Sequence, residues 1–244
     1  MVGPAAQHFV SNRDVISMVE NGSSESQIRI QEMTDSQTPR IPPRLEDQSS
    51  SLTPLTAEAG FLNFEVEDVD LESASAEGVS FQGGSFARVV FRQTCLQRLE
   101  LQDVRLTDCD LANAQFPDAR VVRATMTKCR LTGLQLEESF LQDVHFRSCI
   151  GQLSQFRFSQ LKSCSFEDCD LREANFQGAN LAGVVFGGCD LRNAELSQTT
   201  LTGADLTSSN IEGLRVNREA LRGVVLAPDQ AAYVAGLFGV TVKW

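Results

Sequence analysis

Five of the seven cysteines recur at intervals of twenty residues: Cys109, Cys129, Cys149, Cys169 and Cys189. If residues twenty apart stack on one another, these thiols form a column, and such a column is the pattern in this sequence best suited to redox or metal chemistry. The alternative is structural, because cysteine also packs as a small apolar residue. Zinc prefers four ligands in a tetrahedron, whereas a straight column presents them in a line. The sequence therefore predicts a structural column, with no metal and no cofactor.

Apart from the cysteine column, the sequence gives little support for a catalytic site. The two histidines are His8, in the N-terminal tail, and His145, which is expected to lie outside the coil. No Ser-His-Asp arrangement can be assembled from them. The glycines of "GANLAG" lack the Lys-Ser/Thr pair of a phosphate-binding loop. Cys164 fits the structural interpretation, and Cys95, expected to point outward, is the candidate reactive thiol. The sequence predicts that the protein is not an enzyme.

Charge and hydropathy exclude several classes of partner. The formal net charge is −11, of which −8 falls on residues 56–244. Nucleic-acid affinity comes largely from Lys and Arg, so direct nucleic-acid binding is not expected, whereas a basic protein partner is compatible with this charge. No apolar run approaches 18 residues and no signal-peptide core follows Met1. Neither membrane insertion nor export is predicted, and a cytoplasmic location is expected.

An apolar residue recurs at every fifth position from Phe61 to Leu226. All 34 positions in this range whose numbers end in 1 or 6 are apolar except Gly151, and ten of the fifteen phenylalanines lie on them. Two residues earlier stand mostly small residues, the cysteine column among them. A period of five matches neither a helix nor a strand, and self-similarity at a fixed period predicts a repeat solenoid.

The repeated unit is a small residue, a polar residue, Leu or Phe, and two variable residues. In this pattern segments such as "ADLTS", "ANFQG" and "ANLAG" resemble the pentapeptide repeat family, over roughly residues 60–226. The resemblance implies an all-β fold, a right-handed quadrilateral β-helix in which each pentapeptide forms one side and four form one coil. Residues twenty apart would then stack at about 4.8 Å, and the cysteine column would become an inward-facing ladder.

Three segments are expected along the chain. Residues 1–55 are rich in Ser, Gln, Glu and Pro without a lasting apolar period, which predicts a disordered tail. Residues 56–226 form the β-helix. Residues 227–244 form a C-terminal helix and a terminal strand, in which Pro228 suits the first helical turn and Gly239 suits the helix end.

The C-terminal helix carries an apolar stripe of Val234, Leu237 and Phe238. The stripe must either cap the last coil or pair with another chain, because an open solenoid end exposes unpaired strand edges. The block from "LRGVVL" to "LFGVTV" also resembles the C-terminus of the quinolone-resistance, topoisomerase-binding branch of the family. That resemblance implies a helix that mediates head-to-head homodimers.

Stacking at intervals of twenty also predicts the charge pattern of the surface. Asp68, Arg88, Asp108 and Lys128 alternate in sign along one column, which predicts ladders that neutralise themselves. By contrast, one column contains the candidate partner-facing carboxylates: Asp110, Asp170 and Asp190.

The repeat is interrupted at Gly151. Nearby positions that should face water carry Phe140, Ile150, Leu153 and Phe158. Either the coil bulges so that Ile150 or Leu153 replaces the missing inward side chain, or an apolar patch is left outside. The bulge is the expected outcome.

Two functions are compatible with these features. The expected one is a non-catalytic, rod-shaped scaffold for an unidentified protein partner. The resemblance to the topoisomerase-binding branch implies the alternative, a DNA-mimicking modulator of DNA gyrase or topoisomerase IV with quinolone-protection potential, whose carboxylates stand where phosphates would lie. A continuous acidic stripe favours the mimic, and a checkerboard of charge favours the scaffold.

Overall fold

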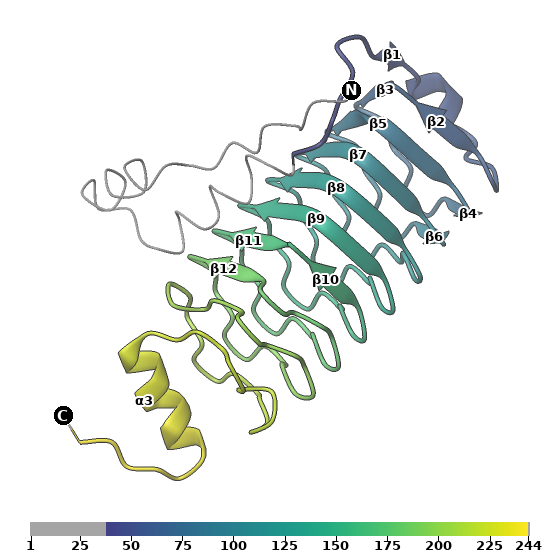
Figure 1. Cartoon of the computed structure of the whole chain (residues 1–244). Helices are drawn as coiled ribbons and strands as arrows, with labels where there is room; N and C mark the ends of the chain where they lie inside the picture. The colour runs from purple at the N-terminus through teal and green to yellow at the C-terminus, as the bar shows by residue number, and fades with distance from the viewer. Residues whose placement is uncertain (1–37, 244) are drawn as a thin grey trace, which may run out of the picture.

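A computed structural model describes residues 38–243, which wind into a parallel β-solenoid of about seven turns followed by one helix (Figure 1). The elements in chain order are β1 (Glu46–Asp47), the 3-10 helix η1 (Ser49–Leu52), β2 (Gly60–Leu62), β3 (Phe64–Glu67), β4 (Ser75–Glu77), β5 (Ser80–Ala87), β6 (Cys95–Gln97), β7 (Glu100–Thr107), β8 (Arg120–Thr127), β9 (Phe140–Arg147), β10 (Gln160–Lys162), β11 (Ser165–Glu167), β12 (Val185–Gly187) and α3 (Pro228–Leu237). Within residues 38–243 no helix is long and apolar enough to cross a bilayer.

Successive coils are joined in parallel register with an offset of twenty residues. Phe81 pairs with Leu101 between β5 and β7, and Val121 pairs with Leu141 between β8 and β9. Where the strands shorten, isolated bridges keep the same offset as far as Asp205 and Val225. Four pentapeptides therefore form one coil, which confirms the predicted β-helix.

The chain turns at residues whose numbers end in 3 or 8. There the backbone is left-handed, as at Asn63 (φ 52°), Asp143 (φ 55°) and Gly178 (φ 71°). Asn, Asp and Gly adopt this conformation more readily than other residues, which explains why they recur at these corners. Leu153 (φ 60°) and Phe158 (φ 58°) adopt it although both are bulky and apolar.

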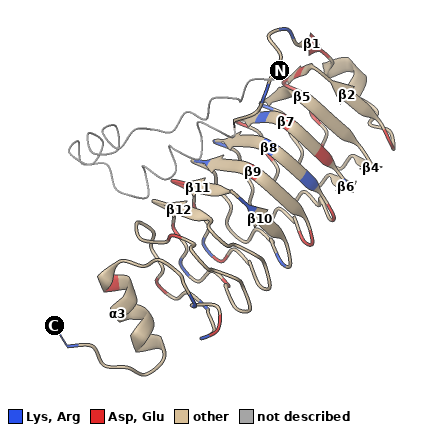
Figure 2. Cartoon of the chain, viewed as in Figure 1, with Lys and Arg blue, Asp and Glu red and all other residues tan. Residues whose placement is uncertain are grey.

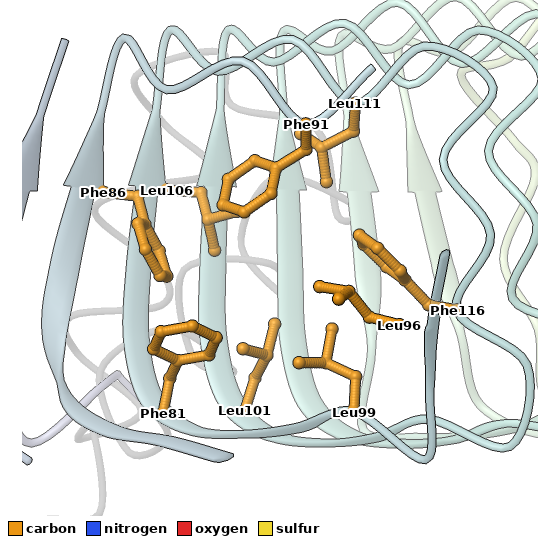
Figure 3. Close-up of a pocket in the computed structure, with 9 residues that line it drawn as sticks. All are labelled: Phe81, Phe86, Phe91, Leu96, Leu99, Leu101, Leu106, Leu111 and Phe116. Atoms are coloured by element: carbon orange, nitrogen blue, oxygen red, sulfur yellow. The ribbon is translucent and has the colours of Figure 1, made fainter. Parts of the chain in front are cut away.

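The inward residues fill the solenoid in stacks. The rings of Phe146, Phe166 and Phe186 lie nearly parallel, with centroids 4.6 Å and 5.1 Å apart. These separations match the strand spacing of about 4.8 Å, so ring stacking and the backbone ladder support each other. Between β5 and β8 nine Phe and Leu side chains surround an apolar void of about 10 Å³ (Figure 3). A void so small and apolar holds no ligand.

The N-terminal end of the solenoid is closed by residues that the sequence places in a disordered tail. β1 pairs with β3, and the side chain of Leu52 in η1 is fully buried against the first coil. The predicted tail is therefore wrong for residues 38–55, because Leu52 covers apolar surface that the open end of the solenoid exposes. The rest of the predicted tail, residues 1–37, lies outside the described residues.

The C-terminal end is closed by α3. The amide of Gln230 donates hydrogen bonds to the carbonyls of Leu206 and Ser209, each at 2.7 Å, and Gly213 N–H donates to the Tyr233 hydroxyl at 2.6 Å. The helix begins at Pro228, and Gly239 (φ 78°) follows its end, as the sequence predicts. Residues 240–243 form no strand, so the predicted terminal strand is absent from the described chain.

The predicted bulge at Gly151 is wrong. The ladder continues through this position, with Leu131 N–H bonded to Ile150 O and Gly151 N–H bonded to Asp170 O, both at 2.7 Å. Ile150 and Leu153 point outward and are about half exposed. The inward space is narrowed by the next coil instead, because a Cβ on Gly151 would lie 3.0 Å from Cδ2 of Leu171.

We expect Gly151→Leu to lower the free energy of unfolding by about 1–3 kcal/mol, because the added side chain overpacks the space that Leu171 narrows. Leu171→Gly serves as the comparison and should cost several kcal/mol through loss of a buried side chain. Urea unfolding followed by circular dichroism measures both. A clear stabilisation by Gly151→Leu would show instead that the slot is vacant.

Candidate interaction surfaces

The cysteine ladder lies inside the solenoid. All five thiols are buried, and each donates to the backbone carbonyl of an inward residue of the preceding coil. Cys149 Sγ, for example, lies 3.3 Å from Met126 O, and Cys189 Sγ lies 3.4 Å from Phe166 O. The thiols therefore supply hydrogen bonds to buried backbone carbonyl groups, which supports a structural role.

Serine takes the same place at Ser139 on another column and at Ser209, the next member of the cysteine column after Cys189. Ser139 Oγ donates to Phe116 O at 3.2 Å, and Ser209 Oγ donates to Phe186 O at 2.9 Å. A small residue with a donor group is thus what this inner position uses, whether the donor is a hydroxyl or a thiol.

Burial inside the solenoid keeps the ladder thiols and Cys164 away from substrates and metal ions in the solvent. Burial raises the pKa of the Cys164 thiol to about 12. Within the ladder the directions alternate: hydrogen bonds between neighbouring thiols raise the pKa of Cys129 and Cys169 and lower the pKa of Cys109 and Cys149. Metal binding and nucleophilic attack both need the thiolate. Residues 38–243 contain no group of three or more His, Cys, Asp or Glu arranged to hold a metal ion.

His145 points outward from the coil, as the sequence predicts, because the next residue on β9, Phe146, points inward, but its side chain is fully buried. Its Nδ1 lies 2.8 Å from Ser165 Oγ, and its Nε2 has no hydrogen-bond partner among residues 38–243. Burial lowers the pKa of the imidazole to about 4, so the ring is neutral. The other histidine, His8, lies outside the described residues. Cys95, expected to point outward, is half-buried in β6.

The candidate partner-facing carboxylates are paired with arginines. Arg172 makes two hydrogen bonds to Asp170, at 2.9 Å and 2.7 Å, and Arg192 binds Asp190 in the same way, at 2.9 Å and 2.6 Å. The Arg172 guanidinium holds the pKa of Asp170 at about 2. Asp110 lies between two more distant guanidinium groups, at 4.0 Å and 3.9 Å.

Charges of opposite sign also alternate between coils at the acidic N-terminal end. Arg88 bridges Glu67 and Asp68, each within 2.8 Å, and Arg92 bonds Glu72 at 2.8 Å. Along the solenoid, Lys and Arg are interspersed with Asp and Glu (Figure 2). The charge pattern is a checkerboard, not a continuous acidic stripe.

One coil carries an apolar outer surface. Ile150, Leu153 and Phe158 are each about 50% exposed, and we refer to these three residues as the apolar coil surface. Phe158 packs over Gly178 of the next coil, where a Cβ would lie 2.5 Å from its ring. The guanidinium of Arg157 lies over the Phe158 ring, 5.5 Å from its centroid. The patch left outside is therefore the alternative that the structure supports.

The C-terminal stripe divides into two parts. Val234 is buried against the last coil, whereas Leu237 and Phe238 are 46% and 47% exposed. The same helix thus caps its own solenoid and leaves an apolar edge beyond the cap.

The sequence analysis did not identify the side chains that close the C-terminal end of the solenoid or the arginines that pair with Asp170 and Asp190. Gln230 and Tyr233 bind the last coil, and no repeat marks them. Arg172 and Arg192 were detectable, because the triplet Asp-Leu-Arg occurs twice at an interval of twenty.

Comparison with protein families matches two models of five-residue repeats. The model of the pentapeptide repeat region matches residues 99–176, and the model of eight pentapeptide repeat copies matches residues 169–207. No curated protein sequence matches this chain significantly.

Solved structures of low sequence identity are also similar. A trypsin-treated variant of QnrB1, a plasmid-mediated fluoroquinolone resistance protein, is 21% identical, with 77% of this chain and 99% of that chain covered and a TM-score of 0.43. HetL of the cyanobacterium Nostoc sp. strain PCC 7120, involved in heterocyst differentiation regulation, is 17% identical, with 69% and 87% covered and a TM-score of 0.32. Both TM-scores are below 0.5, so these likenesses add no evidence on what this chain binds.

We expect Cys149→Ala to lower the free energy of unfolding by about 1–2 kcal/mol, through a small loss of volume and of one hydrogen bond. Cys149→Ser should cost less, because serine makes the equivalent bond at Ser139 and Ser209. Chemical denaturation compares the two variants, and elemental analysis of the purified protein should find no stoichiometric metal. Bound metal, or an equal cost for both substitutions, would contradict the donor role.

Proposed function

Because this chain belongs to the pentapeptide repeat family, we propose that it is a non-catalytic, rod-shaped scaffold that binds protein partners through outward side chains of its coils. The apolar coil surface is the observation that carries this proposal. Exposed apolar side chains gathered on one coil of a largely polar surface are typical of a protein-binding site.

Backbone conformation adds support for a binding role. Leu153 and Phe158 both occupy left-handed corners, where a bulky side chain costs roughly 1–2 kcal/mol relative to its preferred conformation. Neither residue recovers this cost by burial, since each is about half exposed. Strain at exposed apolar residues is more readily explained by contact with a partner than by the stability of the coil.

The alternative, a DNA-mimicking modulator of DNA gyrase or topoisomerase IV, needs carboxylates that remain free to meet a basic channel. The net charge of −11 is in its favour. The arginine pairs of Asp170 and Asp190 are against it, because each guanidinium cancels the charge beside it. The checkerboard therefore favours the scaffold.

The proposal is tested by Leu153→Asn combined with Phe158→Asn in the full-length chain. Asparagine tolerates left-handed corners, so the variant should keep its fold while it loses apolar surface. The matched control is Glu138→Asn with Glu173→Asn, which lie one coil before Phe158 and one coil after Leu153 and are also left-handed corners. Immobilised wild-type protein and the control should retain the same partner from the native cell extract.

The apolar-surface variant should retain that partner at least tenfold less. Equal retention by all three proteins would contradict the proposed binding surface. Purified protein should also leave gyrase supercoiling unchanged at micromolar concentration and low salt. Inhibition that weakens as salt rises would favour the DNA mimic instead.

We also propose that two copies associate through the exposed edge of α3. Leu237 and Phe238, followed by Val240 and Val242, form an apolar surface beyond the cap. A self-complementary patch of this kind gives a symmetric dimer.

Leu237→Asp with Phe238→Asp should therefore convert a dimer into a monomer, measured by light scattering, without lowering the thermal midpoint appreciably. Val234→Asp is the comparison, because it places a charge inside the cap and should destabilise the last coil. A wild-type protein that is monomeric at high micromolar concentration would rule out this dimer.

A further inference from the structure

A groove of about 460 Å³ lies between the last coil and α3, at the C-terminal end of the solenoid (Figure 1). The coil lines it with residues 209–212, and the helix lines it with Asp229, Gln230 and Tyr233. The two walls are joined, because the Tyr233 hydroxyl accepts a hydrogen bond from Gly213 N–H and the Gln230 amide bonds two carbonyls of the solenoid. The groove is therefore a built feature of the fold, and its volume is within the range of ligand sites, about 300–1,000 Å³.

The lining of the groove combines apolar surface, an aromatic ring and carboxylates. The side chain of Ile211 is buried, that of Tyr233 is half-buried, and those of Glu212 and Asp229 are exposed. None of the described residues that line the groove is a lysine or an arginine. The groove thus offers a ligand hydrogen-bond acceptors, negative charge and an aromatic ring, without a cation of its own.

The two carboxylates have no ion-pair partner within residues 38–243. In the coil before Glu212 the equivalent position is Arg192, which makes its hydrogen bonds to Asp190 at 2.9 Å and 2.6 Å. Twenty residues beyond Glu212 the chain has left the solenoid, and the uncharged Ala232 of α3 stands there. The alternation of carboxylates and arginines on this side therefore ends on an unmatched carboxylate at the groove. Asp229 adds a second one from the helix.

We propose that this groove binds an arginine side chain presented by a partner protein. A guanidinium group stacks on aromatic rings and donates hydrogen bonds to carboxylates, and its methylene stem covers apolar surface. The ring of Tyr233 receives the guanidinium, Glu212 and Asp229 accept its N–H groups, and Ile211 contacts the stem. Lysine fits less well, because its ammonium group is compact and more strongly hydrated.

Tyr233 reports on the groove directly, because it is the only tyrosine in the chain. Tyrosine labelled with ¹³C in the ring gives one NMR reporter in the full-length protein. The probe is the peptide acetyl-Gly-Arg-Gly-amide, and the matched control peptide carries citrulline, which has the shape of arginine without its charge. We expect the arginine peptide to shift the Tyr233 signal saturably, with a dissociation constant at least tenfold lower than that of the citrulline peptide. The lysine peptide should bind at least threefold more weakly than the arginine peptide.

Substitution of the carboxylates separates the groove from the general negative charge of the protein. Glu212→Gln and Asp229→Asn should each weaken binding of the arginine peptide about fivefold, and together they should remove its advantage over citrulline. The matched control is Glu219→Gln, since Glu219 is exposed near the same end but does not line the groove. An unchanged amide signal of Gly213 shows that α3 keeps its place in each variant.

Four results would overturn the proposal: no saturable shift at tens of millimolar peptide, equal binding of the arginine and citrulline peptides, binding of the lysine peptide at least as tight as that of the arginine peptide, or the same loss from Glu219→Gln as from Glu212→Gln. None of them bears on the apolar coil surface, which lies three coils earlier in the chain. Failure of the groove and failure of the proposed scaffold function are therefore distinguishable.

Discussion

Each coil has room for four large inward side chains and four small ones, and it is one strand spacing thick, so an inward residue can stack only on the residue twenty positions away. The fixed offset from Phe81 and Leu101 to Asp205 and Val225 is the consequence. A bulge in one strand would disturb the ladder on both sides of it, since each coil is bonded to the coil before and the coil after. At Gly151 the chain therefore keeps its register and gives up an inward side chain, and two apolar residues remain outside.

The same constraint explains how much of the structure was readable from the sequence. Period and register determine which residues point inward, so the β-helix and the stacking of residues twenty apart could be predicted. The start of α3 could be predicted from Pro228. They do not determine what lies beside an outward residue, so the burial of His145 was not predictable. Nor do they determine side-chain direction, which is why the arginines that fold back onto Asp170 and Asp190 were missed. The closing residues Leu52 and Gln230 lie outside the repeat and follow no column.

The arginine pairs matter for the field around the solenoid more than for its stability. Exposed ion pairs contribute about 0–1 kcal/mol each; the pair of Arg88 and Asp68 is exposed, and the pair of Arg172 and Asp170 is only partly buried. Their effect is to cancel carboxylate charge at short range, so the net charge of −11 is not presented as one surface. Recognition then depends on local shape and apolar contact, which makes the exposed coil around Leu153 and Phe158 more informative than the overall charge.

The two ends of a solenoid present backbone groups that no further coil can bind. Here both ends are closed within the chain, by Glu46 N–H bonded to Asn63 O at 2.8 Å and by the Gln230 amide bonded to Leu206 O at 2.7 Å. A second copy is therefore not needed to complete the fold. Association through Leu237 and Phe238 would bury apolar surface beyond a finished cap, so assembly and folding are separable properties of this chain.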